Sequence, residues 1–490
     1  MNKNLGFVKV AAAIPNVRVA DCSYNVQQML DLIAQAEEQR AAVVCFPELS
    51  VTAYTCQDLF RQQVLLEGAE LAVKNLLSYS TQSDTIILAG VPVCCKGTLL
   101  NCAAVIQNGK LLGLVAKRHL SRRDGVSEER WFSSISQTEG IRMVYAGQET
   151  EICTNRIFHT PQFTFGVEIG HDLWSAIPPS TILCLKGAEI IFSLTADNVQ
   201  SGKDAYLHQL VAQQSARCHA AYVVAGCGYG ESTQDMVFPG HALLYDDGNL
   251  IAKGKKFCTK PQLVCSEIDV ELIRNIRISD KIFTSTSVLY QSDYITETTT
   301  DKIISFNAKE SVLTRKVEAL PFIPKDSQLN ERCEEVFSVQ TLGLARRMKH
   351  TRAKSMVIGI SGGLDSTLAL LVCANVCDIL KMPRTSIVGV TMPGFGTTDR
   401  TYTNALSLMK ELGITIREIS IKQACLQHFS DIGHDVKTHD VTYENSQARE
   451  RTQILIDEAN QPSGFDVGTG ALRELAHGWA TENGYHTSTY

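Results

Sequence analysis

The chain has 490 residues, which is too long for a single hydrophobic core and fits two or three domains. Hydrophobic residues at 44% and charged residues at 20% are typical of a soluble globular protein, and no segment is suited to a signal peptide or a membrane span. The formal net charge of -6 shows no basic stripe, so nucleic acid is not an expected partner.

Strand-like and helix-like segments alternate from residue 8 to about residue 283, which indicates an α/β or α+β domain. Apolar runs predict strands at 8–14, 42–46, 85–91, 101–107, 111–114, 163–169, 189–194 and 222–225, and a hairpin at 240–245 and 250–254. Helical spacing predicts helices over 24–39 and about 205–220. We therefore place a first domain at residues 5–270.

The middle of the chain carries weaker patterns. A polar Thr-rich stretch at 296–300 and the prolines Pro321 and Pro324 mark residues 271–327 as a connector. A second alternation follows in residues 328–490, with helices expected at 330–349, 367–380 and 400–412 and strands at 356–360, 387–391 and 415–419. This βαβα order predicts a parallel, doubly wound sheet that binds ligands at the carboxyl ends of its strands.

The cysteines are scattered along the chain. There are 16 of them, several lie in apolar runs (Cys45, Cys102 and Cys373), and no CxxC pair suggests a zinc site. The pattern is typical of buried, reduced thiols, and we therefore expect a cytoplasmic protein.

A glycine turn between a strand and a helix gives the most specific pattern in the chain. Its residues are Gly359, Ile360, Ser361, Gly362, Gly363, Leu364, Asp365 and Ser366. Backbone N–H groups and a helix N-terminus bind anions, and the serines add hydroxyl donors. Asp365 would repel a bare phosphate, which suggests a bridging Mg²⁺, and the Walker lysine is absent.

This SGGxDS turn resembles the PP-loop of ATP pyrophosphatases. Segments 389–406, 432–461 and 467–484 are similar to NAD⁺ synthetases, so the resemblance covers residues 320–490. It implies ATP-dependent conversion of deamido-NAD⁺ into NAD⁺. The nicotinate carboxylate attacks the α-phosphate of ATP, pyrophosphate leaves, and ammonia then displaces AMP. The resemblance also implies a homo-oligomer.

The same resemblance assigns further residues by position. Residues 359–366 would hold the ATP phosphates, Thr469 would contact ATP, and Asp365 and Glu474 would be ligands of Mg²⁺. The residues expected to line the deamido-NAD⁺ site are Asn445, Glu474, Trp479, Ala480, Thr481 and Glu482.

The second domain also departs from the family pattern. Where members usually read GTGDLSEL, this chain has Ala471 and Arg473, and Tyr485 replaces a later acidic residue. Asp466 places a charge in an expected buried strand, which is costly unless it is paired. Family members continue beyond residue 490 and supply a lysine from that continuation. We therefore expect the synthetase site to be incomplete and its turnover weak or absent.

Residues 5 to about 260 resemble the nitrilase (carbon–nitrogen hydrolase) superfamily, which releases ammonia from glutamine in long NAD⁺ synthetases. That chemistry needs a thiolate nucleophile, a carboxylate that handles its proton, and a cation that stabilises the oxyanion. By position the carboxylate is Glu48 and the cation is Lys117. Where family members read close to GVEICEDLW, this chain has Gly170 at the nucleophile position. We therefore expect the amidase half to be inactive.

Neighbouring positions have changed as well. Arg123 stands where the family usually has a glutamine-contacting tyrosine, Asp197 stands where it has a serine, and Lys203 keeps a basic residue at another glutamine-binding position. His171 follows Gly170, but neighbours on a strand point to opposite faces, so we do not expect it in the same pocket.

Together these patterns and resemblances predict an α/β protein that descends from glutamine-dependent NAD⁺ synthetases. The expected fold is a four-layer αββα nitrilase-type sandwich followed by a doubly wound, PP-loop domain related to adenine nucleotide alpha hydrolases. The expected substrates are ATP, deamido-NAD⁺ and glutamine or ammonia, with Mg²⁺. Three states remain open: a glutamine-fed ligase, a ligase that uses ammonia alone, and a pseudoenzyme that binds nucleotides or partners without turnover.

Overall fold

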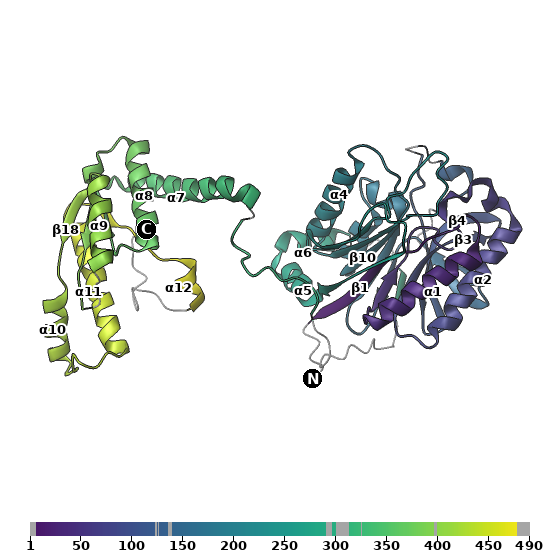
Figure 1. The fold of residues 1–490 in the computed structure, drawn as a ribbon, viewed down its shortest axis with the longest axis horizontal. Coiled ribbons are helices and arrows are strands. Elements are labelled where there is room, and N and C mark those ends of the chain that lie inside the picture. The colour runs from purple at the N-terminus through teal and green to yellow at the C-terminus, as the bar shows by residue number, and fades with distance from the viewer. Residues whose placement is uncertain are drawn as a thin grey trace. The chain divides into compact units, whose positions relative to one another are not determined.

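The computed structural model describes residues 6–122, 125, 127–135, 140–290, 296–299, 313–324, 326–395 and 399–477. The chain forms two compact units that divide between Val317 and Glu318 (Figure 1). Within the described residues, no helix combines the length and the apolar character that crossing a bilayer requires.

Two mixed sheets form the first unit. The eight-stranded sheet has the order β14-β1-β2-β3-β4-β5-β7-β6 and the seven-stranded sheet has the order β13-β12-β11-β10-β9-β8-β15. The eight-stranded sheet contains β1 (Phe7–Ile14), β2 (Val43–Cys45), β3 (Ile86–Cys95), β4 (Thr98–Gln107), β5 (Lys110–Ala116), β6 (Ile141–Tyr145), β7 (Gln148–Cys153) and β14 (Gln262–Asp269). The seven-stranded sheet contains β8 (Arg156–His159), β9 (Thr164–Ile169), β10 (Ile190–Thr195), β11 (Ala221–Gly226), β12 (Ala242–Asp246), β13 (Asn249–Lys253) and β15 (Thr296–Thr299).

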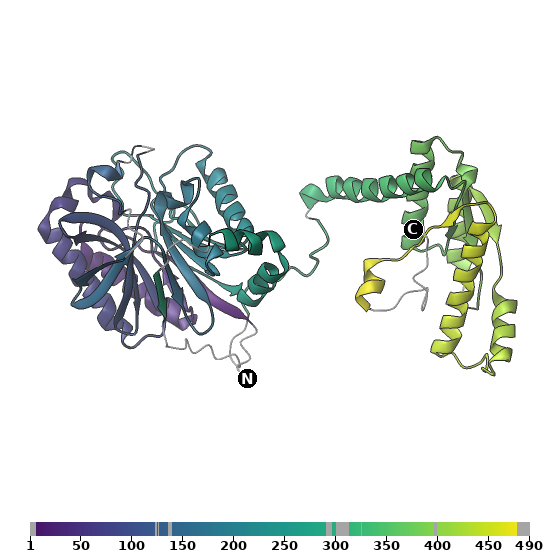
Figure 2. The ribbon, with the colours of Figure 1, turned by 180° about the vertical axis from the view of Figure 1, so that it is seen from behind.

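The central strands of each sheet are buried on both faces, because apolar side chains point to both sides of these strands. In β1, Val10 and Ala12 pack between the sheets, whereas Ala11 and Ala13 face the helices. Helices α1 (Cys22–Glu38) and α2 (Gln63–Ser80) cover the eight-stranded sheet. Helices α3 (Pro179–Leu185) and α4 (Lys203–Arg217) cover the other sheet. Figure 2 shows the same layers from behind, with α4 on the outer side of its sheet. The layers confirm the predicted αββα sandwich.

The expected connector, residues 271–327, contributes structure to the first unit as far as Val317. It supplies most of α5 (Val270–Ser279), then α6 (Lys281–Leu289), and β15, which pairs in parallel with β8. Arg277 in α5 anchors this segment, since its Nη2 donates to the backbone oxygens of Ala188 at 2.7 Å and Cys218 at 3.1 Å.

The second unit contains a parallel sheet with the strand order β18-β17-β16-β19. Its strands are β16 (Met356–Gly359), β17 (Ile387–Thr391), β18 (Thr415–Glu418) and β19 (Phe465–Asp466). Helices α7 (Leu329–Thr351), α8 (Leu364–Leu380) and α9 (Asp399–Glu411) share a core on one face. Helix α11 (Val441–Asn460) packs on the other face, with α10 (Lys422–Asp431) beside it. Helices on both faces confirm the doubly wound arrangement.

Candidate active sites in the two units

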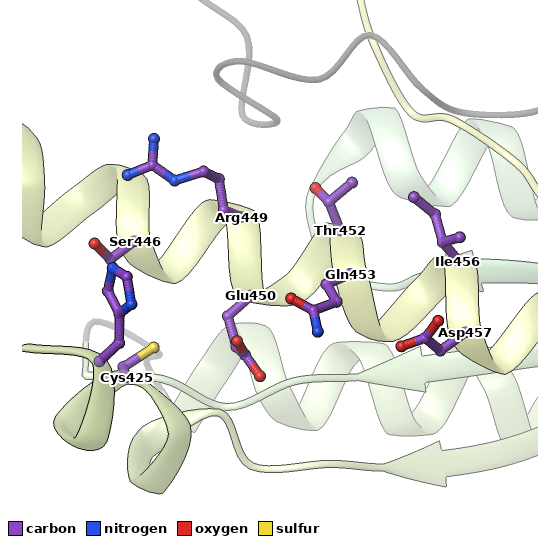
Figure 3. Close-up of a pocket in the computed structure, with 9 residues that line it drawn as sticks. Cys425, Ser446, Arg449, Glu450, Thr452, Gln453, Ile456 and Asp457 are labelled. Atoms are coloured by element: carbon purple, nitrogen blue, oxygen red, sulfur yellow. The ribbon is translucent and has the colours of Figure 1, made fainter. Parts of the chain in front are cut away.

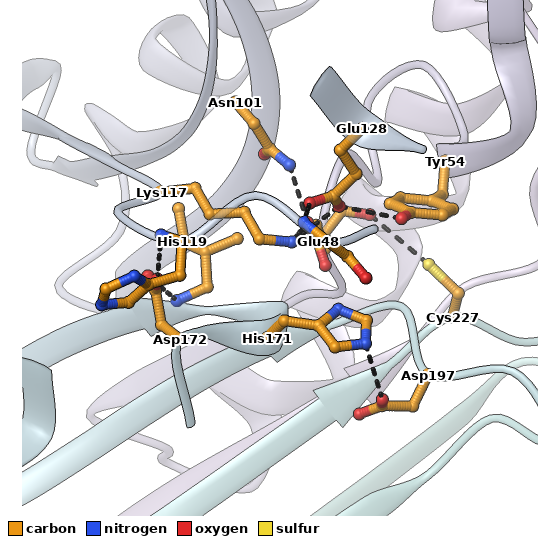
Figure 4. A network of polar contacts seen from close by, with 12 residues as sticks. Glu48, Tyr54, Asn101, Lys117, His119, Glu128, His171, Asp172, Asp197 and Cys227 are labelled. Carbon is orange, nitrogen blue, oxygen red and sulfur yellow. Dashed lines mark hydrogen bonds and ion pairs between the residues drawn. The ribbon is translucent and has the colours of Figure 1, made fainter. Parts of the chain in front are cut away.

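Glu48, Lys117 and Gly170 meet at one place in the first unit. They follow the carboxyl ends of β2, β5 and β9, respectively. Lys117 Nζ lies 2.6 Å from Glu48 Oε1, and both side chains are buried (Figure 4). A Cβ atom built on Gly170 would stand 2.3 Å from Glu48 Oε2 and 2.6 Å from Lys117 Nζ. The carboxylate and the cation therefore face a position that has no side chain.

Other buried groups complete this cluster, and the sequence patterns did not single them out. Lys117 Nζ also lies 2.6 Å from Glu128 Oε1, which accepts a 2.8 Å hydrogen bond from the Tyr54 hydroxyl. Asn101 Nδ2 donates to Glu48 Oε1 at 2.6 Å. Glu128 begins the short 3-10 helix η2 (Glu128–Arg130), where the run Glu-Glu-Arg suggests only solvated charges. No periodic pattern marks such a residue.

The electrostatics of the cluster follow from its burial. Burial raises the pKa of Glu48 to about 8, although Lys117 acts against this rise. Burial alone would lower the pKa of Lys117, but Glu128 and Glu48 outweigh it and raise that pKa. For Glu128, Lys117 and several hydrogen bonds outweigh burial and lower the pKa. Burial thus makes Glu48 easier to protonate than a carboxyl in water, whereas the charged forms of Lys117 and Glu128 stabilise each other.

His171 departs from the expectation based on strand alternation. Strand β9 ends at Ile169, and Gly170 begins a 3-10 helix, η3 (Gly170–Trp174), with φ +51°. The imidazole is turned toward Asp197, with 4.0 Å between His171 Nε2 and Asp197 Oδ1 (Figure 4). Burial and then Lys117 lower the pKa of His171, which favours the neutral ring. The alternation rule fails here because residues 170 and 171 are not in a strand.

Two of the three residues at expected glutamine-binding positions lie together. Lys203 Nζ is 3.2 Å from Asp197 Oδ1, and both residues line a small pocket of about 70 Å³. Arg123 lies outside the described residues. A buried carboxylate and a lysine thus neutralise each other at the edge of the cluster.

The glycine turn of the second unit, or cradle, lies between the carboxyl end of β16 and the start of α8. Gly362 has φ +82° and packs so closely on Thr401 that a Cβ would stand 2.2 Å from its backbone oxygen. Helix α8 begins at Leu364, three residues earlier than expected, so its N-terminus lies within the turn. Ser361 Oγ and Ser366 Oγ are 3.2 Å apart, and Leu364 is 87% exposed. The N-terminus of α8 therefore lies at the surface of the unit, and one N–H of the turn, that of Gly363, donates to Ser361 Oγ at 3.3 Å.

Residues near the C-terminus come to the same edge of the sheet. β19 pairs in parallel with β16, and Val467 N donates to Val357 O at 2.8 Å, so Thr469 follows a strand beside the cradle. Glu474 is in α12 (Leu472–His477), and its Oε2 accepts a 3.2 Å hydrogen bond from Ala471 N. The expected burial of Asp466 is confirmed, with 6% exposure in β19. Trp479, Ala480, Thr481, Glu482 and Tyr485 lie outside the described residues.

A pocket of about 520 Å³ lies along α11 (Figure 3). Its wall includes Cys425 and His428 from α10, and Ser446, Arg449 and Gln453 from α11. Ser446 is buried, and its hydroxyl has no hydrogen-bond partner among the described residues. Asn445, which was predicted to contact the dinucleotide, precedes Ser446 in the first turns of this helix.

Comparison with known proteins agrees with this two-part organisation. Residues 9–278 match the carbon-nitrogen hydrolase family and residues 336–488 match the NAD synthase family. The glutamine-dependent NAD(+) synthetase of Mycobacterium tuberculosis is 33% identical over 484 residues, covering 97% of this chain and 71% of that protein. The synthetase of Mycobacterium leprae is 33% identical over 488 residues, with the same coverage. A crystal structure of the Cytophaga hutchinsonii enzyme aligns with a TM-score of 0.48 at 21% identity, covering 97% of this chain and 76% of that one. The chain belongs to the family of glutamine-dependent NAD(+) synthetases.

Proposed function

We propose that the second unit uses ATP to convert deamido-NAD⁺ into NAD⁺. The cradle supports this most directly, because it places N–H groups, two serine hydroxyls and the N-terminus of α8 at the carboxyl end of a central parallel strand. Such a site binds the β- and γ-phosphates, which leave as pyrophosphate when the substrate carboxylate attacks the α-phosphate. Ammonia then attacks the activated carbonyl, and AMP leaves.

The side chains at the cradle fit a Mg²⁺ ion that is shared with the nucleotide. No group of three histidine, cysteine or acidic residues in the described ranges is arranged to hold a metal. Mg²⁺ is commonly held by one or two carboxylates together with substrate phosphates, so such a group is not required. Asp365 in the first turn of α8 would supply one carboxylate and Glu474 the other. When bound, the ion would neutralise charge on the phosphates.

The pocket along α11 is the proposed site for part of deamido-NAD⁺. It lies beside Asn445 and offers the guanidinium of Arg449, the Gln453 amide and the Ser446 hydroxyl, which has no hydrogen-bond partner in the part of the chain that the structure describes. A dinucleotide carries a pyrophosphate and many hydroxyl groups, which suit such donors.

The nitrogen donor is proposed to be free ammonia. Covalent hydrolysis of glutamine needs a side chain that attacks the amide carbonyl, and Gly170 offers none. Glu48 and Lys117 already occupy the space in front of that position. The first unit therefore keeps the proton-handling and oxyanion-stabilising groups without the nucleophile.

Two measurements test these proposals separately. Calorimetry with ATP and Mg²⁺ should show binding that Asp365→Ala weakens at least about tenfold, since a charge-assisted contact contributes roughly 1.5–3 kcal/mol. Equal binding by wild type and variant would refute the nucleotide site. NAD⁺ should form only slowly from deamido-NAD⁺, ATP and ammonium, because Ala471 and Arg473 depart from the family pattern, whereas glutamine alone should give neither NAD⁺ nor glutamate. Glutamate release from glutamine would show that the first unit hydrolyses it by another route.

A further inference from the structure

His219 connects three separate parts of the first unit, away from both sites described above. It lies in the turn between α4 and β11, where its backbone has φ +42°. Its Nδ1 is 2.9 Å from Oδ1 of Asp247, in the turn between β12 and β13. Its Nε2 is 2.9 Å from Oδ2 of Asp280, the residue between α5 and α6. Both ring nitrogens therefore face a carboxylate.

This arrangement favours the charged imidazole. A neutral imidazole has one N–H and one bare lone pair, so it can donate to only one of the two carboxylates. The protonated ring donates from both nitrogens and carries a charge that both carboxylates attract. Burial alone would lower the pKa of His219, but the hydrogen bonds to Asp280 and Asp247 outweigh it and raise that pKa.

The cationic side chains around the ring make their contacts elsewhere. Arg277 of α5 has its Cζ 5.0 Å from the centroid of the Phe283 ring, and its Nε donates to the His219 backbone oxygen at 2.9 Å. Arg217 at the end of α4 and Lys281 at the start of α6 each donate to a group three positions earlier in the chain. Among the described residues, the two aspartates are therefore the charged groups that contact the ring nitrogens.

Helix α6 is attached to the first unit by few contacts, and the contact between His219 and Asp280 is at its start. None of the side chains of α6 is buried. Asp280 caps the helix, because its carboxylate accepts from two backbone N–H groups of the first turn at 2.7 Å and 3.3 Å. Further along, the Phe283 ring packs edge-on against the imidazole, and Ser287 Oγ donates to the Leu185 backbone oxygen at 2.6 Å. A helix with no buried apolar face opens at low cost, so each of these contacts matters.

We propose that His219 is a latch that holds α6 on the first unit while its ring is protonated and releases the helix when the ring loses that proton. Deprotonation leaves one carboxylate facing a lone pair, so the ring can no longer join Asp247 to Asp280. The latch is complete below pH 6.5, the ordinary pKa of histidine, and is lost as the pH rises through the raised value of the folded state. The inference rests on these contacts and does not depend on the proposed ligase activity.

Hydrogen exchange of the full chain, followed by mass spectrometry at pH 5.5 and pH 8.5, measures the opening of α6 once intrinsic exchange rates are corrected for. We expect protection of the α6 amides to be at least about threefold lower at pH 8.5, as for the loss of a part-exposed ion pair. The amides of Thr314 and Arg315 are the internal control. They donate to Glu267 at 3.1 Å and 2.8 Å, and the lowered pKa of Glu267 keeps it charged at both pH values. Protection of α6 that changes no more than that of the control would overturn the proposal.

Two variants separate the latch from a purely structural contact. His219→Gln does not titrate, so α6 should have the same low protection at both pH values. His350→Gln, on the exposed side of α7, should keep the wild-type response. Asp247→Asn lets a neutral His219 donate to Asp280 and accept from the new amide, so α6 should stay protected at pH 8.5.

A fall in α6 protection equal to that of the wild type, in either His219→Gln or Asp247→Asn, would show that the pH response arises elsewhere. Thermal unfolding checks that each variant is folded. Asp247→Asn decides the question if His219→Gln does not fold.

Discussion

The carboxylate of Glu48 occupies the space that a side chain at Gly170 would need. A Cβ at position 170 would stand 2.3 Å from Glu48 Oε2, far inside van der Waals contact, and the backbone there has φ +51°. Loss of the nucleophile is thus accompanied by a packed arrangement of the remaining groups. Replacing the glycine alone would have to displace a buried, hydrogen-bonded carboxylate.

Restoring a side chain at position 170 should therefore destabilise the first unit. We expect Gly170→Ala to lower the free energy of unfolding by about 2–4 kcal/mol, because overpacking adds to the backbone strain. Gly97→Ala is the control, since Gly97 also has positive φ but no atom of the described residues lies within 4 Å of its Cβ position, and the substitution should lower the free energy of unfolding by about 1 kcal/mol. Urea unfolding of Gly170→Ala and Gly97→Ala measures the two losses of unfolding free energy. Gly170→Cys should also release no glutamate from glutamine, and equal stability of both alanine variants would contradict the packing argument.

The buried cation Lys117 should contribute far more to the free energy of unfolding than an exposed lysine does. Lys117→Met would leave Glu48 and Glu128 without their common partner, which should cost about 3–5 kcal/mol of unfolding free energy. Lys74→Met removes an exposed pair, since Lys74 Nζ lies 3.2 Å from Glu70, and should cost under about 1 kcal/mol. Chemical denaturation of both variants at pH 7 measures the difference. Similar losses would show that the cluster is not held by its ion pairs.

Glu168 should make stability fall as the pH rises. Burial raises its pKa from 4.5 to about 8, and its Oε1 has no hydrogen-bond partner among the described groups. Between these two pH values the folded state binds a proton that the unfolded state has lost, so the free energy of unfolding decreases with pH. Glu168→Gln carries a neutral amide that does not titrate. As the pH rises from 4.5 to 8.5, its free energy of unfolding should therefore increase by about 3–5 kcal/mol relative to that of the wild type.

Urea unfolding at several pH values tests this expectation. Glu38→Gln, at the exposed end of α1, is the surface control and should parallel the wild type throughout. A constant difference between wild type and Glu168→Gln across this range would rule out the assigned titration.

The phosphate cradle should not tolerate a side chain at Gly362. A Cβ there would stand 2.2 Å from the Thr401 backbone oxygen, and the backbone has φ +82°. We expect Gly362→Ala to weaken ATP–Mg²⁺ binding at least about tenfold by distorting the turn, a loss of about 1.4 kcal/mol or more. Gly413 also has positive φ, but no described atom lies within 4 Å of its Cβ position, so Gly413→Ala should leave ATP–Mg²⁺ binding unchanged. Calorimetry compares the affinities of both variants for ATP–Mg²⁺. Unchanged affinity in Gly362→Ala would show that the nucleotide binds elsewhere.

Arg449 should contribute to binding of the dinucleotide and leave ATP binding unaffected. Its side chain lines the α11 pocket, where a guanidinium can bind a pyrophosphate. Arg449→Ala should weaken deamido-NAD⁺ binding by about tenfold, within the range for charge-assisted hydrogen bonds. Arg384→Ala breaks a pair with Asp378 in a different part of the unit and should have no effect. Equal affinities for deamido-NAD⁺ in the two variants would argue against this pocket.

The sequence by itself determined the features that depend on neighbours in the chain. The alternation of apolar segments predicted an α/β or α+β first domain and the doubly wound sheet of the second. The resemblance to the nitrilase superfamily, carried by short motifs, implied the sandwich and the roles of Glu48, Lys117 and Gly170, and the glycine turn predicted a phosphate-binding turn at a strand end. These patterns are local, because strand period and turn chemistry are set by consecutive residues.

Only the tertiary structure decided which distant side chains complete each site. Glu128 joins Lys117 from a loop with no periodic pattern, and His171 turns toward Asp197 because β9 has already ended. Each of these contacts depends on how separate elements pack and on the burial that results. Packing between distant elements is a property of the whole fold, so no short stretch of sequence specifies it.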